Sequence, residues 1–229
     1  MSDIQLNYVE RGAGDALILL HGNGESLDYF SGQIDFFAKS CRVIALDTRG
    51  HGASPRGSAP FTIRQFAEDL RAFMDEKGIE AAHILGFSDG GNIALTFALH
   101  YPERVDRLIL NGANLFPAGV KPTVQLPIVL GYHTASLFAK RSPKAKENAA
   151  LLGLMVKEPN IRPEELNGLT VPTLVIAGTK DMIRESHTRL IARSLPNARL
   201  VLLPGDHFIA NKEPAVFNRA VRNFLDEEV

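Results

Sequence analysis

The chain has 229 residues, of which 45 % are hydrophobic and 22 % are charged, and its formal net charge is -1 at pH 7. This composition is typical of a globular protein, and a chain of this length can bury a sizeable core as one domain. A net charge so close to zero argues against nucleic acid as a partner. The single cysteine, Cys41, excludes an intramolecular disulfide, and its place beside an apolar strand predicts a buried, unreactive thiol.

The apolar segments are all short. None approaches the roughly 20 residues needed to span a bilayer, so we expect no membrane partner. The first residues, Met1–Gln5, contain neither a basic region nor a long apolar one, so we expect no signal peptide and a cytoplasmic protein, as a monomer or homodimer. No cluster of potential ligands has metal-binding spacing, so we expect neither a metal ion nor an organic cofactor.

Short apolar runs alternate with helical patterns along the chain, which predicts a mostly parallel sheet with helices on both faces. The first run, Ile4–Glu10, alternates apolar and polar residues and is expected at an edge of the sheet. Further strands are predicted over Ala16–Leu20, Arg42–Leu46, Ala82–Leu85, Arg107–Leu110, Thr173–Ile176 and Arg199–Leu202. Helices are predicted over Ser26–Lys39, Ile63–Lys77, Gly90–His100, Glu185–Leu195 and Glu213–Asp226.

The alternation breaks from Leu115 to about Leu169, where prolines punctuate helical patterns such as Gly131–Lys140 and Lys144–Val156. We interpret residues 115–169 as a small helical lid over the carboxyl ends of the strands, inserted into a core formed by residues 1–114 and 170–229. The apolar side chains of this lid either line a substrate pocket or attach the lid to the core. The pocket candidates among them are Leu126, Tyr132, Phe138 and Met155, and Gly24 and Glu25 are two further residues expected to contact substrate.

One segment, Gly86–Gly90, predicts a nucleophile. It reads G-x-S-x-G, and it lies where a strand should end and a helix should begin. A serine on such a sharp turn has its hydroxyl exposed to substrate, and the flanking glycines allow the close backbone approach that the turn demands. We therefore identify Ser88 as a candidate nucleophile; the alternative is a glycine-rich turn in which Ser88 caps the helix.

A serine nucleophile needs a general base and a third group that orients this base. His207 is the best base, since it follows a strand end and a Pro-Gly turn and should lie on a loop at the carboxyl edge of the sheet. Asp181 is the best third member, because it follows another apolar strand and a glycine turn. Asp206 is interpreted as a turn residue, and Glu185 is a weaker rival of Asp181.

Attack on a carbonyl creates an oxyanion that needs preorganised donors. We expect one donor to be the backbone N–H of Asp89, the residue after the nucleophile. The other should come from the loop that follows the strand Ala16–Leu20, with the N–H of Asn23 preferred and that of Gly24 next. His21 in the same loop is expected to be structural.

These landmarks together resemble the α/β-hydrolase family over essentially the whole chain, with the triad in the order Ser88, Asp181, His207. The resemblance implies the α/β-hydrolase fold and makes the segment Asp47–Ser54 a scaffold loop. The lid is shorter than many in the family, which favours an accessible pocket. Because the nucleophile is a serine, the branches that use an aspartate, the dehalogenases and epoxide hydrolases, are disfavoured.

Two carboxylates bear on the substrate. Ser88-Asp89-Gly90-Gly91 resembles the biphenyl-hydrolase-like branch, in which a matching acidic residue attracts the amino group of an amino-acid ester; alternatively, Asp89 only stabilises the helix N-terminus. Glu25 either reaches the mouth of the pocket or is an exposed carboxylate at a helix start.

The function that these residues predict is hydrolysis of small carboxylic esters through an acyl-enzyme. Two alternatives stay open. The same triad can serve a lyase or a carbon–carbon bond hydrolase, or it can be retained in a small-molecule receptor with little turnover.

Overall fold

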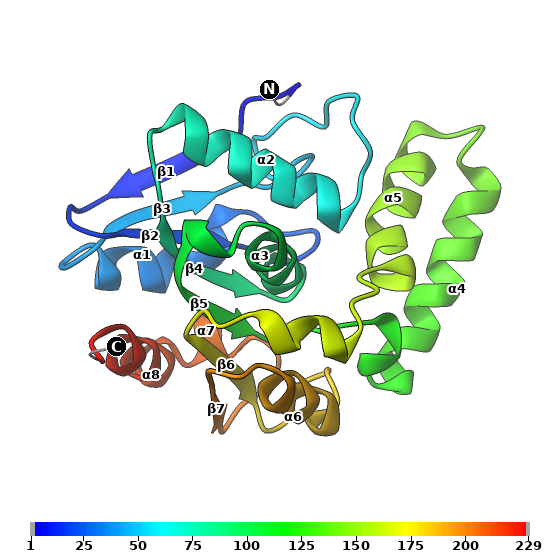
Figure 1. The fold of residues 1–229 in the computed structure, drawn as a ribbon. Coiled ribbons are helices and arrows are strands. Elements are labelled where there is room, and N and C mark those ends of the chain that lie inside the picture. Colours follow the sequence, from blue (N-terminus) through cyan, green and yellow to red (C-terminus); the bar gives the residue numbers. More distant parts are fainter. Residues whose placement is uncertain (1–2, 228–229) are drawn as a thin grey trace.

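The structure, a computed structural model, describes residues 3–227 and contains one seven-stranded sheet (Figure 1). The strand order is β1-β3-β2-β4-β5-β6-β7, and every neighbouring pair is parallel except β1 with β3. The strands are β1 (Tyr8–Arg11), β2 (Ala16–Leu20), β3 (Arg42–Leu46), β4 (Ala82–Phe87), β5 (Val105–Asn111), β6 (Thr173–Gly178) and β7 (Ala198–Leu203). The mostly parallel sheet of the sequence-based expectation is therefore present.

Helices cover both faces of this sheet, which buries the apolar side chains of its central strands on both sides. Helices α2, α3 and α6 cover one face, and α1, α7 and α8 cover the other (Figure 1). The α-helices are α1 (Ser31–Phe37), α2 (Ile63–Glu76), α3 (Asp89–His100), α4 (Pro122–Phe138), α5 (Pro143–Lys157), α6 (Glu185–Ser194), α7 (Ile209–Lys212) and α8 (Pro214–Leu225). Short 3-10 helices are η1 (Leu27–Phe30), η2 (Pro102–Arg104), η3 (Pro117–Gly119) and η4 (Pro163–Gly168).

The expected strands agree closely with the observed ones, apart from the first. That strand is β1, which lies at the edge as expected but covers only Tyr8–Arg11. It pairs with β3 in antiparallel register, Tyr8 opposite Leu46. The stretch before it is not part of the sheet, because it runs along α2, where the side chains of Ile4 and Leu6 line a cavity.

One expected helix is divided in the structure: the segment Ser26–Lys39 forms η1 and then α1. The expected helix Glu213–Asp226 is present as α8, and a separate short helix, α7, precedes it. Ser26 caps η1 by accepting a hydrogen bond from the N–H of Asp28. Proline at the first position of α8 has no N–H to offer to the preceding turn, so α7 and α8 do not join into one helix.

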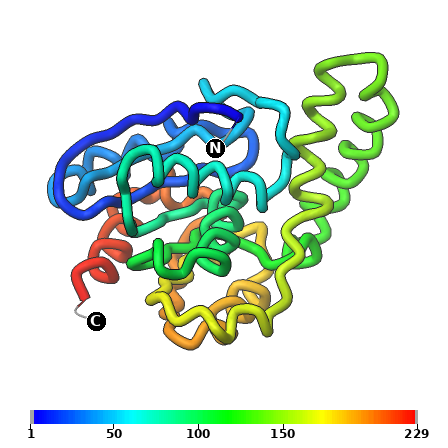
Figure 2. Tube along the Cα trace, turned by 45° about the horizontal axis from the view of Figure 1, so that its top comes forward, coloured from blue at the N-terminus to red at the C-terminus, as the bar shows by residue number. Residues whose placement is uncertain are grey.

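Residues 122–157 form a helical hairpin, α4 followed by α5, which we call the cap hairpin. It stands off from the sheet and its covering helices in both ribbon and tube views (Figures 1 and 2). Helix α4 starts nine residues earlier than the predicted Gly131–Lys140, and it runs through Pro127. The predicted range therefore missed the first turns of α4: the ring of Pro127 removes one backbone hydrogen bond, but the helix continues through it.

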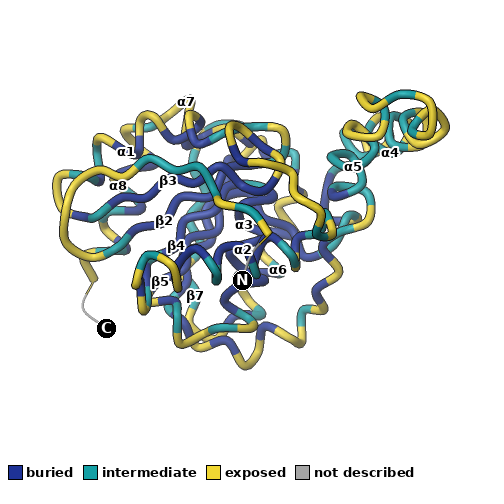
Figure 3. Tube along the Cα trace, turned by 90° about the horizontal axis from the view of Figure 1, so that it is seen from above, coloured by how far each residue is buried: buried dark blue, intermediate teal, exposed yellow. Residues whose placement is uncertain are grey.

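Burial follows this arrangement (Figure 3). The central strands are buried, whereas α4 has no buried residue and α5 has one, Leu154. No helix within residues 3–227 is long and apolar enough to cross a membrane.

Candidate active site

Ser88 lies in the turn between β4 and α3, with φ 54° and ψ -120°. It is the only non-glycine residue with a positive φ within residues 3–227, and side chains other than glycine seldom adopt this conformation. The backbone of this turn also packs closely against neighbouring backbone atoms. A Cβ atom on Gly86 would lie 2.2 Å from the carbonyl oxygen of Gly90, and one on Gly90 would lie 2.0 Å from that of Leu20. Both glycines of the G-x-S-x-G pattern are thus required by packing.

The structure brings Ser88, His207 and Asp181 together at the carboxyl edge of the sheet, from the loops after β4, β7 and β6. His207 Nε2 lies 3.0 Å from Ser88 Oγ, and His207 Nδ1 lies 2.7 Å from Asp181 Oδ1. The same Oδ1 accepts the N–H of Ile183 at 2.8 Å, which holds the carboxylate in place. A carboxylate at Nδ1 keeps the proton on that nitrogen, so Nε2 can accept the proton of the serine hydroxyl.

The two other acids considered for this role point elsewhere. Asp206 accepts the N–H of Phe208 and forms an ion pair with Lys212, so it is a turn residue as expected. Glu185 forms an exposed ion pair with Arg189.

Gly112 supports the histidine and was missed in the sequence. It follows β5 with φ +63°, and a Cβ atom there would lie 2.7 Å from His207 Cε1 and 3.3 Å from Asp181 Oδ2. Its neighbour Asn111 accepts the Ser88 N–H through its carbonyl oxygen at 2.8 Å. A glycine two residues after the predicted strand Arg107–Leu110 was the available signal for a close approach at this position.

The loop after β2 carries Asn23, the residue expected to be the second oxyanion donor. His21 is buried, its Nδ1 lies 2.7 Å from the Gly22 oxygen, and its Nε2 accepts the N–H of Thr48. Burial lowers the pKa of His21 to about 4, so it is a neutral, structural residue, as expected. The Asn23 N–H has no acceptor among the described residues. The Asp89 N–H lies in the first turn of α3, where N–H groups have no partner within the helix.

The same loop is attached to the cap hairpin. The side-chain amide of Asn23 donates to the carbonyl oxygen of Leu151 in α5 at 2.8 Å. The base of the hairpin is joined to the loop that carries Asp181: Val120 forms a β-bridge with Ile183, and the Lys121 N–H donates to the Met182 oxygen at 2.9 Å. Displacement of the hairpin would therefore strain both the loop that contains Asn23 and the loop that carries Asp181.

A pocket of about 250 Å3 opens onto Ser88 and His207. It lies between the sheet edge and the first turns of α4, and its walls are mainly apolar. Its other described lining residues are Gly22, Asn23, Glu25, Phe87, Val124, Ile128, Met155, Met182 and Phe208.

Of the six residues expected to bind substrate, Glu25 and Met155 line this pocket, and the other four do not. Leu126 and Phe138 point outwards from α4 and are 67 % and 53 % exposed. Val124 and Ile128, which lie one turn apart, face the pocket, and Leu126 lies between them on the opposite side of the helix. Tyr132 lies under the ammonium group of Lys157, and the surroundings of Gly24 are open.

Two acidic groups near the pocket are affected by burial. Burial raises the pKa of Glu25, whose Oε2 accepts the N–H of Gly22 at 3.2 Å. Burial also raises the pKa of Asp89, to about 6. Asp89 Oδ1 accepts the side-chain amide of Asn92 at 3.1 Å, and Oδ2 is buried without a hydrogen-bond partner among the described residues. Asp89 does not line the pocket.

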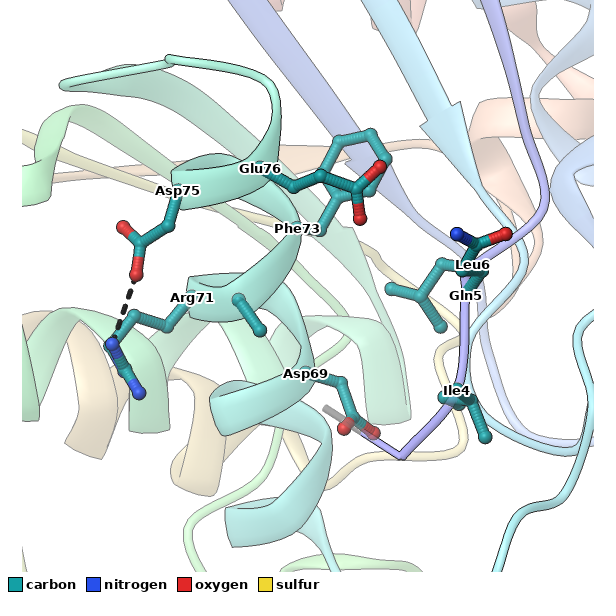
Figure 4. Close-up of a pocket in the computed structure, with 9 residues that line it drawn as sticks. Ile4, Gln5, Leu6, Asp69, Arg71, Phe73, Asp75 and Glu76 are labelled. Atoms are coloured by element: carbon teal, nitrogen blue, oxygen red, sulfur yellow. Dashed lines mark hydrogen bonds and ion pairs between the residues drawn. The ribbon is translucent and has the colours of Figure 1, made fainter. Parts of the chain in front are cut away.

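A larger cavity, of about 460 Å3, lies between α2 and the segment that precedes β1 (Figure 4). Arg71 and Asp75 form an ion pair at its rim, and Leu6 and Phe73 face it. Its described lining contains no serine, cysteine or histidine, so nucleophilic chemistry is assigned to the Ser88 pocket. Within residues 3–227 no group of His, Cys, Asp and Glu side chains has the arrangement of a metal site.

Comparisons with known proteins agree with the fold. A family model described as alpha/beta hydrolase fold matches residues 15–132. The chain is 28 % identical to the 3-oxoadipate enol-lactonase 2 of Acinetobacter baylyi, over 96 % of this chain and 92 % of that protein. The enol-lactonase of Burkholderia xenovorans has a similar structure, with a TM-score of 0.83 and 26 % identity over 98 % of this chain and 97 % of that one. A meta-cleavage product hydrolase of Pseudomonas fluorescens is also similar, with a TM-score of 0.78 and 25 % identity over 97 % and 94 % of the two chains.

Proposed function

Because the chain belongs to the alpha/beta hydrolase fold family, we propose that it is a serine hydrolase that cleaves small carboxylic esters, including cyclic ones, through an acyl-enzyme. The observation that carries the proposal is the hydrogen-bonded chain Ser88–His207–Asp181, with heavy-atom distances of 3.0 and 2.7 Å. Enol-lactonases among the similar proteins support hydrolysis of an ester bond.

The proposed reaction follows from the position of each group. Ser88 Oγ attacks the ester carbonyl while its proton moves to His207 Nε2, and Asp181 stabilises the imidazolium that forms. The N–H groups of Asn23 and Asp89 donate to the oxyanion. His207 then protonates the leaving alcohol oxygen and, in the second half of the reaction, takes a proton from water, whose oxygen attacks the acyl carbon and releases the acid.

The lining of the pocket limits the substrate. Glu25 is the only acidic residue among the described residues that line it, and neither lysine nor arginine lines it. An acidic group in an apolar, weakly screened pocket repels anions and attracts cations. We therefore propose neutral or amino-bearing esters as substrates, rather than esters that carry a carboxylate. Asp89 has the same sign of charge but lies behind the pocket, so its contribution to this preference is a separate question.

Two alternatives use the same groups. A carbon–carbon bond hydrolase has support from the similarity to the meta-cleavage product hydrolase, and a receptor would bind its ligand without turnover. The apolar lining of the pocket favours the ester, because it offers no further base beside His207 and Glu25 for a proton-transfer reaction.

Hydrolysis of p-nitrophenyl esters, from acetate to laurate, tests the proposal. The wild type is expected to be active and Ser88→Ala to lose activity by about four to six orders of magnitude. The dependence of activity on the length of the acyl chain then indicates the size of the pocket. If the wild type is inert towards every ester, the ester-hydrolase proposal is wrong. Turnover of a carbon–carbon substrate would then support the carbon–carbon bond hydrolase, whereas thermal stabilisation by a ligand that is not turned over would support the receptor.

A further inference from the structure

The cap hairpin carries an unusual combination of charge and exposed apolar surface. Its residues, 122–157, contain five lysine or arginine residues and one glutamate. Their net charge is thus +4, while that of the whole chain is -1, so the remainder carries -5. Six large hydrophobic side chains are exposed within residues 3–227. Four of them lie on α4: Leu126, Leu130, Leu137 and Phe138.

The apolar side chains form a stripe on the outer side of the hairpin. Leu126, Leu130 and Leu137 follow the spacing i, i+4, i+11, which places them within one narrow sector of α4. They are 67 %, 69 % and 79 % exposed. Since Val124 and Ile128 of the same helix face the Ser88 pocket, closure of the hairpin onto the core would leave this stripe exposed.

The cations gather at the tip of the hairpin, which we define as residues 137–146. Lys140, Arg141, Lys144 and Lys146 are all exposed, and none of them forms an ion pair with a described residue. Leu137 begins the same segment. The tip therefore places unpaired positive charge beside an exposed leucine, on the part of the molecule that projects farthest from the sheet (Figures 2 and 3).

Beside the tip, an apolar groove of about 570 Å3 runs between α4 and α5. Leu130, Phe138 and Leu152 line it, with small residues such as Gly131 and Ala145 between them. The groove shares no described lining residue with the Ser88 pocket, and no lysine, arginine, aspartate or glutamate is among its described lining residues. It can accept an aliphatic chain next to the charged tip.

From this arrangement we propose that the cap hairpin docks on an anionic lipid surface, with Leu137 entering the headgroup region and the four cations of the tip contacting lipid phosphates. Apolar residues flanked by lysine and arginine are the features by which a helix binds at a bilayer surface without crossing it. A second copy of the chain is a poor occupant, because pairing two hairpins would bring like charges together. The inference does not depend on the reaction catalysed at Ser88.

The chain contains no tryptophan, which allows a direct test with a single fluorescent reporter. The full-length variant Leu137→Trp is mixed with vesicles of phosphatidylcholine alone or of phosphatidylcholine with phosphatidylglycerol. We expect its emission to shift to shorter wavelength with the anionic vesicles only. Val216→Trp is the matched control, because Val216 is 45 % exposed on α8, on the core; we expect its emission to stay unchanged.

Charge variants test whether the tip is the contact. Lys140→Gln with Arg141→Gln should lower partitioning onto anionic vesicles, measured by co-sedimentation, by roughly 30-fold. Lys39→Gln with Arg219→Gln removes the same charge from exposed, unpaired positions on the core and should leave partitioning within about twofold of the wild type.

Apolar variants test the insertion. Leu130→Gln with Leu137→Gln keeps good helix formers on α4 and should lower partitioning by at least about tenfold. Circular dichroism of each variant shows whether it is folded. The proposal is overturned if the wild type does not bind anionic vesicles, or if the core variants lose as much binding as the tip variants. Binding to polyglutamate without binding to vesicles would instead identify the tip as a site for an acidic protein.

Discussion

The side-chain amide of Asn23 donates to the carbonyl oxygen of Leu151 at 2.8 Å, which joins the loop beside the nucleophile to α5 of the cap hairpin. The backbone N–H of the same residue is a proposed oxyanion donor. One residue thus serves both the proposed chemistry and the position of the hairpin, and its substitution tests whether the two are connected.

We expect Asn23→Ala to lower kcat for a p-nitrophenyl ester by about tenfold to a hundredfold, since a loop displaced by about 1 Å can lose this much. Deuterium uptake at the amides of residues 151–157 should rise, because α5 loses an attachment to the core. Asn148→Ala is the matched control: it removes an exposed amide from the same helix without touching the loop. An unchanged kcat in Asn23→Ala would show that the attachment of the cap hairpin through Asn23 does not affect the reaction.

The strain at Ser88 predicts a gain in stability when function is removed. Its φ of 54° and ψ of -120° are readily adopted only by glycine. Ser88→Gly should raise the free energy of unfolding by about 1 kcal/mol, measured by urea denaturation. Ser88→Ala keeps a Cβ atom and should not share this gain. Equal stability of the two variants would show that the turn is not strained.

Asp89 predicts a pH-dependent effect on stability. Its pKa in the folded chain is about 6, because burial disfavours the charged form, while the ordinary value is about 4. The folded state therefore holds the proton to higher pH than the unfolded state, and stability falls as pH rises between these two values. Above pH 6 the cost of the buried charge is present in full.

Asp89→Asn should consequently raise the free energy of unfolding by about 3 kcal/mol at about pH 8 and change it little at about pH 3. Asp35→Asn, at an exposed position of α1, is the control and should show no such dependence on pH. The same variant tests the idea that Asp89 selects amino-bearing esters. If the ratio of kcat/KM for an aminoacyl ester and its neutral isostere is unchanged in Asp89→Asn, that idea is wrong.

The negative charge of Glu25 predicts a preference among charged substrates. Glu25→Gln should lower kcat/KM for a cationic ester about tenfold and raise it by a similar factor for an ester that bears a carboxylate, with the neutral isostere little changed. Asp35→Asn again provides the control. A carboxylate-bearing ester that is already the best substrate of the wild type would contradict the assigned role of Glu25.

The sequence alone predicted much of the core, because local patterns carry that information. Apolar runs bounded by turn residues indicated the central strands, and G-x-S-x-G between a strand and a helix indicated the Ser88 turn. The strand ends before Asp181 and His207 placed these residues at one edge of a parallel sheet, since all such ends meet there. That reasoning needs only the order of the strands and helices along the chain.

Contacts between distant segments were decided by the tertiary structure. The tight fit of Gly112 against His207 depends on how two loops meet, and no local pattern encodes it. The direction of each side chain on α4 depends on where that helix starts and which side faces the core, so Leu126 was expected in the pocket and lies outside it. The hydrogen bond from Asn23 to Leu151 joins residues 128 positions apart. Periodicity identifies a helix, but the packing partner determines which of its faces is used.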